Sequence, residues 1–166
     1  SPPAVLKAMS TLAAKLNALN LQRREIEKEM KQQAAQSLDK LELADGDLPD
    51  ILCLYDAHWH QGVIGILASR LKGKYHRPVI IFANGSDHEI KGSGRSVAGV
   101  HIRDLLSLVD TRNPGLIKKF GGHAMAAGLT LATKDFACFQ TQLLAIGKQI
   151  ISDDLLQGIL YTDGEL

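Results

Sequence analysis

The sequence predicts an α/β fold, with a mixed β-sheet flanked by helices and preceded by one long connector helix. Three observations support this prediction. Residues 4–43 carry apolar side chains at helical spacing and contain neither Gly nor Pro. Short apolar runs at 51–55 and 78–83 are typical of buried strands, and helical patterns alternate with them. The composition, 45% apolar and 22% charged, is that of a globular protein.

The long helix is expected to bear a narrow apolar stripe, interrupted once at Arg23. Its members are Val5, Met9, Leu12, Leu16, Leu19, Ile26 and Met30. A helix of this length spans about 50 Å, which is more than the rest of the chain can cover. Two interpretations remain open, a coiled-coil dimer and a connector between two domains of one chain, and the second is favoured. The missing initiator Met also favours a segment of a longer protein.

The remaining elements follow from the apolar periodicity and from the Gly and Pro positions. Strands are expected at Ile51–Tyr55, Pro78–Ala83, Glu89–Ser96 and Gly128–Thr133, and helices at Gly62–Lys72, at His101–Val109 and after Thr133, which would cap the last one. Residues 159–161 are expected to form an isolated strand. The predicted division is a connector helix (1–45), a globular domain (46–155) and the start of a following domain (156–166).

Charge is nearly balanced over the whole chain, with 19 Lys and Arg against 18 Asp and Glu. Between residues 58 and 103, however, Asp87 and Glu89 are the only acids among many basic residues, namely Arg70, Lys72, Lys74, Arg77, Lys91, Arg95 and Arg103. A basic centre in a neutral chain indicates either a locally held anionic ligand or a solvated basic face. Charge alone leaves both open.

Localisation is predicted from the chain start and the cysteines. Ser1-Pro2-Pro3 has neither the basic region nor the apolar stretch of a signal peptide, and no apolar run approaches the about 20 residues of a membrane span. Cys53 and Cys138 lie in apolar runs without a CxxC pair, so buried, reduced thiols are expected. These features predict a cytoplasmic protein without a membrane partner.

Two glycine-framed motifs are the strongest candidates for a ligand site. In the first, Gly92-Ser93-Gly94-Arg95-Ser96, two glycines would expose backbone N–H groups, and two hydroxyls and a guanidinium add donors suited to a phosphate. In the second, Gly121-Gly122-His123, the glycines would present backbone donors and the His a donor to an oxyanion. A tight turn without a ligand remains the alternative for each.

A third segment, His58-Trp59-His60-Gln61-Gly62, precedes a predicted helix, where backbone N–H groups and the helix dipole favour anions. His58 and His60 at i, i+2 lack the further ligands that a metal site requires, so no metal is assigned here. Trp59 is expected to be a packing residue and, as the alternative, a base-stacking platform. No nucleophile elbow or Walker A loop occurs.

Four segments, taken in order and spacing, carry a family resemblance: Trp59–Leu71, Arg77–Ile80, Gly92–Ser96 and Phe120–Gly128. Together they resemble the DHH-associated domain of the RecJ family of single-strand-specific 5′-to-3′ DNA exonucleases, within the DHH phosphoesterase superfamily. Leu19–Glu27 is similar to the start of the helix that joins this domain to the catalytic DHH domain. The likeness covers nearly all of residues 10–150.

The resemblance implies a division of labour. A DHH domain elsewhere in the chain would hold Mn²⁺ or Mg²⁺ and activate water, whereas this segment, which lacks the Asp-His-His triplet, would bind no cofactor and be inactive alone. His123 would make a supporting catalytic contact with the scissile phosphate. Single-stranded DNA with a 5′ phosphate would be held by Gly92, Ser93, Gly94, Arg95, Ser96, Gly121, Gly122, His60 and Arg70.

The same resemblance implies a role in DNA recombination and repair, a monomeric parent protein, and an oligonucleotide-binding-type domain that begins near residue 156. Two other functions remain open. One is a DHH-type phosphodiesterase for short oligonucleotides or cyclic dinucleotides. The other is a non-catalytic nucleic-acid-binding module that dimerises through helix 4–43.

Overall fold

The predicted α/β class is confirmed in the computed structural model, which describes residues 2–40 and 48–163, with side chains to residue 151. The sheet is mixed and five-stranded, in the order β1-β2-β3-β5-β4, with β1 and β2 parallel and the other pairs antiparallel. The elements are α1 (Pro2–Lys40), β1 (Leu52–Tyr55), α2 (Gln61–Tyr75), β2 (Val79–Asn84), β3 (Glu89–Arg95), α3 (Ile102–Arg112), β4 (Ile117–Gly122), β5 (Ala126–Ala132), a 3₁₀ turn (Thr133–Asp135) and α4 (Phe136–Asp163).

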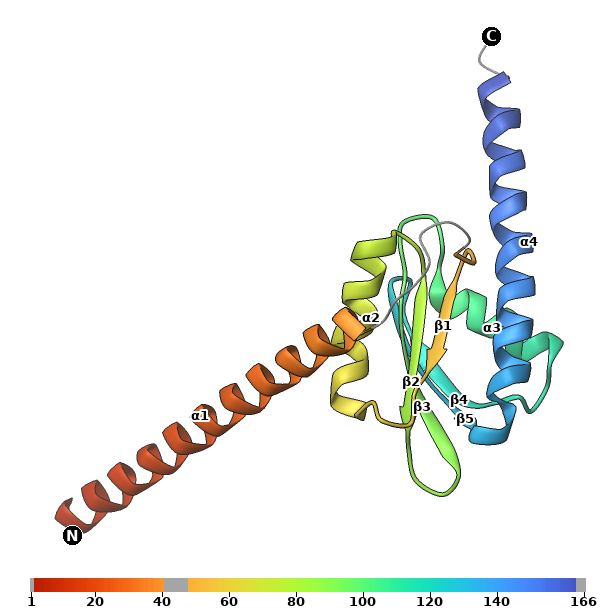
Figure 1. The fold of residues 1–166 in the computed structure, drawn as a ribbon. Coiled ribbons are helices and arrows are strands. Elements are labelled where there is room, and N and C mark those ends of the chain that lie inside the picture. Colours follow the sequence, from red (N-terminus) through yellow and green to blue (C-terminus); the bar gives the residue numbers. More distant parts are fainter. Residues whose placement is uncertain (1, 41–47, 164–166) are drawn as a thin grey trace.

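The helices cover the two faces of the sheet unequally (Figure 1). Helices α3 and α4 pack on one face, where a large apolar core includes Phe82, Leu106 and Phe139. On the other face, α2 packs on β1 and β2 through a smaller core that includes Leu67 and Ile81. Strands β4 and β5 have no helix on that second face, so part of the sheet stays open beside α2.

Strand β4 was not expected from the sequence. Lys118, Lys119 and the glycines at 121 and 122 are poor strand formers, and they hide the pattern that Ile117 and Phe120 provide. The strand lies at the edge of the sheet, and a register shift between Ile117 and Lys119 marks a bulge. Lysines and bulges are common on edge strands because they discourage pairing with another chain.

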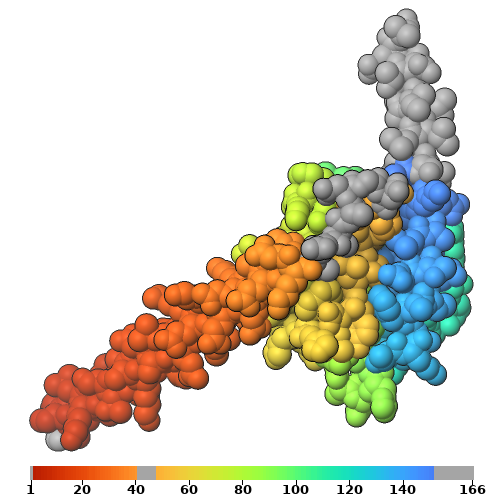
Figure 2. All heavy atoms as spheres, in the orientation of Figure 1, coloured from red at the N-terminus to blue at the C-terminus, as the bar shows by residue number. Residues whose placement is uncertain are grey.

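Helix α1 behaves as its stripe predicts. The stripe residues from Val5 to Leu19 are about 60% exposed, whereas Ala34 is fully buried near the C-terminal end of the helix. There α1 packs on α2, and Leu38 joins the smaller core. Figure 2 shows the helix, in red to orange, projecting from the rest of the molecule. The domain therefore covers only the last few turns of α1.

Three expectations in the C-terminal part are wrong. Thr133 does not cap the last helix by its side chain; its backbone N–H donates to His88 O, and a 3₁₀ turn precedes α4. Residues 159–161 continue α4 and form no strand, because a short apolar run fits either periodicity. Cys138 is exposed on α4 one position before the buried Phe139, which turns it about 100° from the inner face.

The remaining expectations concern Cys53, the loop before β1 and membrane-spanning helices. Cys53 is buried and free, as predicted. The loop that Gly46 and Pro49 predict at residues 44–49 lies mostly outside the described residues. Within the described part of the chain, no helix has the length and apolar character needed to cross a membrane.

Candidate nucleic-acid interface

The first glycine-framed motif lies in the middle of the sheet. Strand β3 pairs with β2 on one side and β5 on the other, so its backbone N–H groups are engaged in the ladders. The expectation that these glycines expose backbone N–H groups to a ligand is therefore wrong, although the predicted strand is confirmed. Instead they leave room for packing: a Cβ on Gly92 would lie 2.5 Å from the Phe82 ring, and one on Gly94 would lie 2.6 Å from Ile102.

Side chains alternate along β3, so the residues between the glycines face α2. Lys91, Ser93 and Arg95 are all half-buried on that face. They line one wall of an open groove of about 590 Å³, and α2 forms the other wall. From α2, the groove is lined by Gln61, Gly62, Ile64, Gly65, Ile66 and Ser69.

Arg95 is held in place at the base of this groove. Its Nη1 donates to Ser93 Oγ (3.0 Å) and to Gly94 O (2.8 Å). Its Nη2 lies only 3.1 Å from where a Cβ of Gly65 would stand, so the missing side chain seats the guanidinium against α2. No carboxylate in the described part of the chain forms an ion pair with it. A positioned, uncompensated guanidinium is well suited to an oxyanion.

Ser96 is placed differently from the rest of its motif. It is fully buried, and its hydroxyl donates to Val100 O while its backbone N–H donates to Met125 O. In this structure the residue anchors the end of β3 to the following loop, and its side chain does not line the groove.

The second glycine-framed motif forms the β4–β5 hairpin at the same end of the sheet as Arg95, since Arg95 pairs with Ala126. Gly122 has φ +146°, and a Cβ there would lie 2.4 Å from Ala126 O, so only glycine fits. The turn is closed by His123 N–H, which donates to Ala126 O at 2.8 Å. The His123 side chain is exposed.

His60 and Arg70 lie farther from this arrangement. His60 caps α2: its Nδ1 accepts a hydrogen bond from Gly62 N–H at 3.1 Å. Arg70 is exposed on α2 but does not line the groove.

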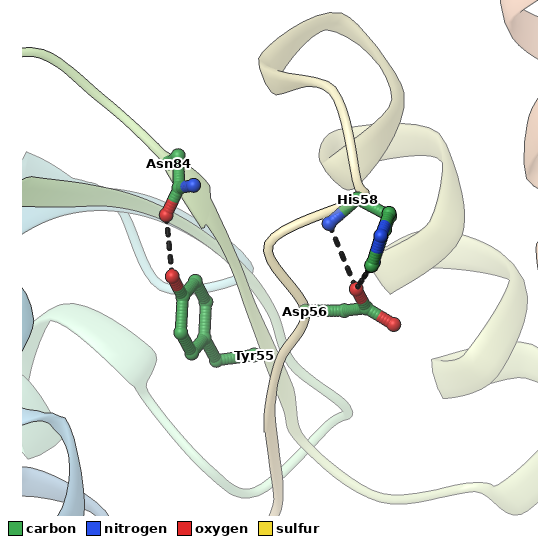
Figure 3. Close-up of polar contacts among 4 residues, drawn as sticks. All are labelled: Tyr55, Asp56, His58 and Asn84. Carbon is green, nitrogen blue, oxygen red and sulfur yellow. Dashed lines mark hydrogen bonds and ion pairs between the residues drawn. The ribbon is translucent and has the colours of Figure 1, made fainter.

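The carboxyl ends of the parallel strands β1 and β2 carry further polar contacts (Figure 3). Tyr55 Oη donates to Asn84 Oδ1. Asp56 accepts from His58 N–H at 2.8 Å and contacts His58 Nδ1 at 3.1 Å. The backbone hydrogen bond, followed by the imidazole contacts, lowers the pKa of Asp56. Within the described residues, no group of three or more His, Cys, Asp or Glu side chains gathers to hold a metal ion.

The sheet and its groove correspond to a known type of domain. A family model described as the DHHA1 domain matches residues 49–149, which is more than half of the chain. The chain belongs to the DHHA1 domain family. The match begins just before β1 and ends within α4, so the whole sheet and the groove lie inside this DHHA1 domain.

Curated relatives extend the likeness beyond the DHHA1 domain into α1. The single-stranded-DNA-specific exonucleases RecJ of Dickeya dadantii and Escherichia coli are each 49% identical over 155 residues, or 93% of this chain. The chain spans 27% of the length of each. A crystal structure of RecJ from Thermus thermophilus in complex with Mg²⁺ matches 76% of this chain and 19% of that one, at 27% identity and a TM-score of 0.65.

Sequence reasoning missed the groove wall that α2 contributes to the DHHA1 domain. Gln61, Gly65 and Ser69 recur every four residues and so share one helix face. A stripe of small and polar residues beside the apolar face was the signal that marked this wall. Lys91 was noted only as part of the basic centre.

Proposed function

We propose that this DHHA1 domain holds single-stranded DNA for a 5′-to-3′ exonuclease whose catalytic part lies elsewhere in a longer chain. The seated, uncompensated Arg95 in the groove carries this proposal. A 5′ phosphate accepts from the donors of Arg95 that do not bond Ser93 and Gly94, and Ser93 lies beside it.

The groove suits recognition of the DNA backbone in preference to bases. It offers a guanidinium, an ammonium and hydroxyls from Arg95, Lys91, Ser93 and Ser69, all of which match phosphate oxygens. No described helix covers β4 and β5 on the adjoining face, which leaves room for a strand without base-specific contacts. Such contacts position a nucleic acid and give a binding affinity that falls with salt.

Hydrolysis is assigned to the DHH domain of the same longer protein. RecJ of Thermus thermophilus has been solved in complex with Mg²⁺ and in complex with Mn²⁺. The residues described here do not by themselves fit such an ion, since no three candidate ligands meet. The metal would activate water in the other domain, and this chain alone is proposed to be inactive.

His123 is proposed to assist from the hairpin. Its ring is exposed, its turn is fixed by Gly122, and it lies at the same end of the sheet as Arg95. A neutral or protonated imidazole there donates to a phosphate oxygen of the strand that Arg95 holds. Four further residues remain predicted phosphate contacts. Gly121 would donate from the hairpin, and His60 and Arg70 from α2. The buried Ser96 would need a local rearrangement to do so.

The exposed stripe of α1 supports a connector, as the proposed domain division requires. Leu12, Leu16 and Leu19 are each about 60% exposed, and the chain spans only 27% of its relatives. We assign this stripe to the rest of a monomeric longer chain, with a further domain from about residue 156. Free thiols at Cys53 and Cys138 fit a cytoplasmic setting. A role in DNA recombination and repair is proposed from the likeness to RecJ.

The test measures binding of the 166-residue chain to an eight-nucleotide single strand by fluorescence anisotropy at low salt. Binding should be tighter with a 5′ phosphate than with a 5′ hydroxyl. Arg95→Ala should weaken it about 10-fold to 100-fold, the value of losing a charge-assisted hydrogen bond worth about 1.5–3 kcal/mol. Arg112→Ala, on the far side of the sheet, is the control.

Two results would contradict the proposal. One is equal binding by the Arg95 and Arg112 variants, which would make the groove irrelevant. The other is Mn²⁺-dependent cleavage of DNA by the pure chain, which would place the hydrolytic site here. Sedimentation of the same chain separates the connector from the alternative of a dimerising module, since a stable dimer without DNA binding supports only the latter.

A further inference from the structure

The open face of the sheet carries its side chains in rows that the strand register defines. Each row crosses from β3 over β5 toward β4, on the face that α2 leaves uncovered. After the Glu89–Ala132 pair at the start of β3, the rows are, in order, Lys91–Thr130–Lys119, Ser93–Gly128–Gly121 and Arg95–Ala126. The first of these, Lys91–Thr130–Lys119, is called the lysine row.

The lysine row places two ammonium groups on one side of the sheet. Lys91 Nζ donates to Thr130 Oγ1 at 3.0 Å, which fixes it over the buried threonine. Lys119 also pairs with Thr130, from the other side, and its side chain is exposed. The two lysines therefore flank one threonine, with their backbones about 10 Å apart across three strands.

Charge near the lysine row is strongly positive. The carboxylate beside it belongs to Glu89, which forms an ion pair with Lys118 at 3.0 Å. The pKa of Glu89 is lowered, first by the hydrogen bond from Lys118 and more weakly by the charges of Lys91 and Lys119. One carboxylate thus meets three ammonium groups, and the charge of the row is left uncompensated.

The row between the lysines and Arg95 has almost no side chains. A Cβ on Gly121 would meet nothing within 4 Å, and one on Gly128 would meet only Gly92 O, at 3.8 Å. Unlike Gly92, these glycines are not needed for packing. They leave an open floor between the two positive ends of the face.

The distance between the ends matches a short piece of nucleic acid. Lys91 and Arg95 are four residues apart on β3, which is about 13 Å. One strand of B-DNA places a phosphate about every 3.4 Å along the axis, so the span covers at most about four nucleotides, and fewer in an extended strand.

We propose that the lysine row is a second phosphate subsite, which holds a later phosphate of the strand whose first phosphate lies at Arg95. The intervening nucleotides cross the bare floor of Gly128 and Gly121. This inference rests on the proposed function and adds a direction to it: the strand runs along β3, from the hairpin end toward the β2–β3 turn. The subsite is filled only by strands long enough to reach it.

The test compares strands of two lengths on the 166-residue chain. Competition anisotropy measures the affinity of a 5′-phosphorylated dinucleotide and of an eight-nucleotide strand for wild type, Lys119→Ala and Lys148→Ala. Lys148 is an exposed lysine on α4, across the sheet, and serves as the matched control for net charge. The Lys119 side chain makes no hydrogen bond or ion pair within the described residues, so its removal should leave the thermal midpoint unchanged.

Lys119→Ala should weaken the longer strand about threefold to tenfold and lower the slope of log affinity against log salt by about one. It should leave the dinucleotide unchanged, and Lys148→Ala should change neither. Equal effects of the two lysine variants, or an equal loss for both lengths, would overturn the subsite. If binding depends on Arg95 but not on Lys119, only the subsite fails; if the wild type binds neither strand, the proposed function fails with it.

Discussion

Gly65→Ala separates the stability of α2 from the seating of Arg95. Gly65 is half-buried inside α2. Alanine is about 1 kcal/mol more favourable than glycine in a helix interior, so helix propensity by itself should stabilise the variant. The added Cβ, however, would lie 3.1 Å from Arg95 Nη2 and 3.5 Å from Ser93 Oγ. The distance to Arg95 Nη2 is shorter than an ordinary van der Waals contact, so the guanidinium must move by a few tenths of an ångström.

The displacement of the Arg95 guanidinium should weaken the binding of a 5′-phosphorylated strand. If the shifted guanidinium loses about 1 kcal/mol of its contact with a phosphate, the dissociation constant rises about fivefold. The gain in helix stability should raise the melting temperature by about 2–4 °C. Opposite signs for stability and affinity are the signature of a residue that positions Arg95.

Gly73→Ala is the matched control in the same helix. A Cβ at Gly73 would meet nothing within 4 Å, so this variant gains helix propensity without touching the groove. Calorimetry and anisotropy with a 5′-phosphorylated eight-nucleotide strand measure both properties. The reasoning is refuted if the two variants bind equally well, or if Gly65→Ala melts below the wild type.

The remaining predictions concern the hairpin, the thiols and Asp56. Gly122→Ala should destabilise the fold by about 1–3 kcal/mol or more, because φ is +146° and a Cβ would meet Ala126 O at 2.4 Å, whereas Gly121→Ala should be nearly neutral in urea unfolding. A thiol reagent should modify Cys138 at once and Cys53 only on unfolding, since burial raises the pKa of the Cys53 thiol; rapid labelling of both would contradict this. The pKa of Asp56 should lie below its usual range, so its carboxylate stabilises the fold above the unfolded pKa and loses that effect as pH falls through the folded pKa. His58→Ala should keep most of this shift in an NMR titration, because the backbone N–H of residue 58 is its largest cause, and a return to the usual value would assign it to the imidazole.

The apolar pattern of the sequence was enough to predict most of the fold. Four of the five strands and all four α-helices of the described residues were expected, the helices from their periodic apolar positions and β1 and β2 from continuous apolar runs. Strand β4 was not predicted because it carries the lysines and the bulge that are common on edge strands. These features interrupt the alternation of apolar and polar residues. The local sequence does not decide between helix and strand for residues 159–161, because a strand also needs a neighbouring strand to pair with.

The candidate site was predicted in its residues but not in its geometry. Arg95 and Ser93 do line a groove, but the second wall comes from α2, about 30 residues earlier in the chain. Only the pairing of β2 with β3 brings Gly65 and Arg95 together, and that contact is not visible in local sequence. Ser96 belongs to the same motif and yet is buried, because it continues the alternation that places Ile90, Gly92 and Gly94 on the core face.

Glycine in this chain serves three different purposes, and what a Cβ would meet at each position tells them apart. At Gly92 it would strike a phenylalanine ring, so this glycine is required by the core. At Gly122 it would strike backbone at a positive φ, so this glycine is required by the turn. At Gly121 and Gly128 it would meet open space or a single atom at van der Waals distance, so neither packing nor conformation explains the choice. A ligand that passes close to the sheet would select against a side chain there, which supports the open floor between Arg95 and the lysine row as the path of the strand.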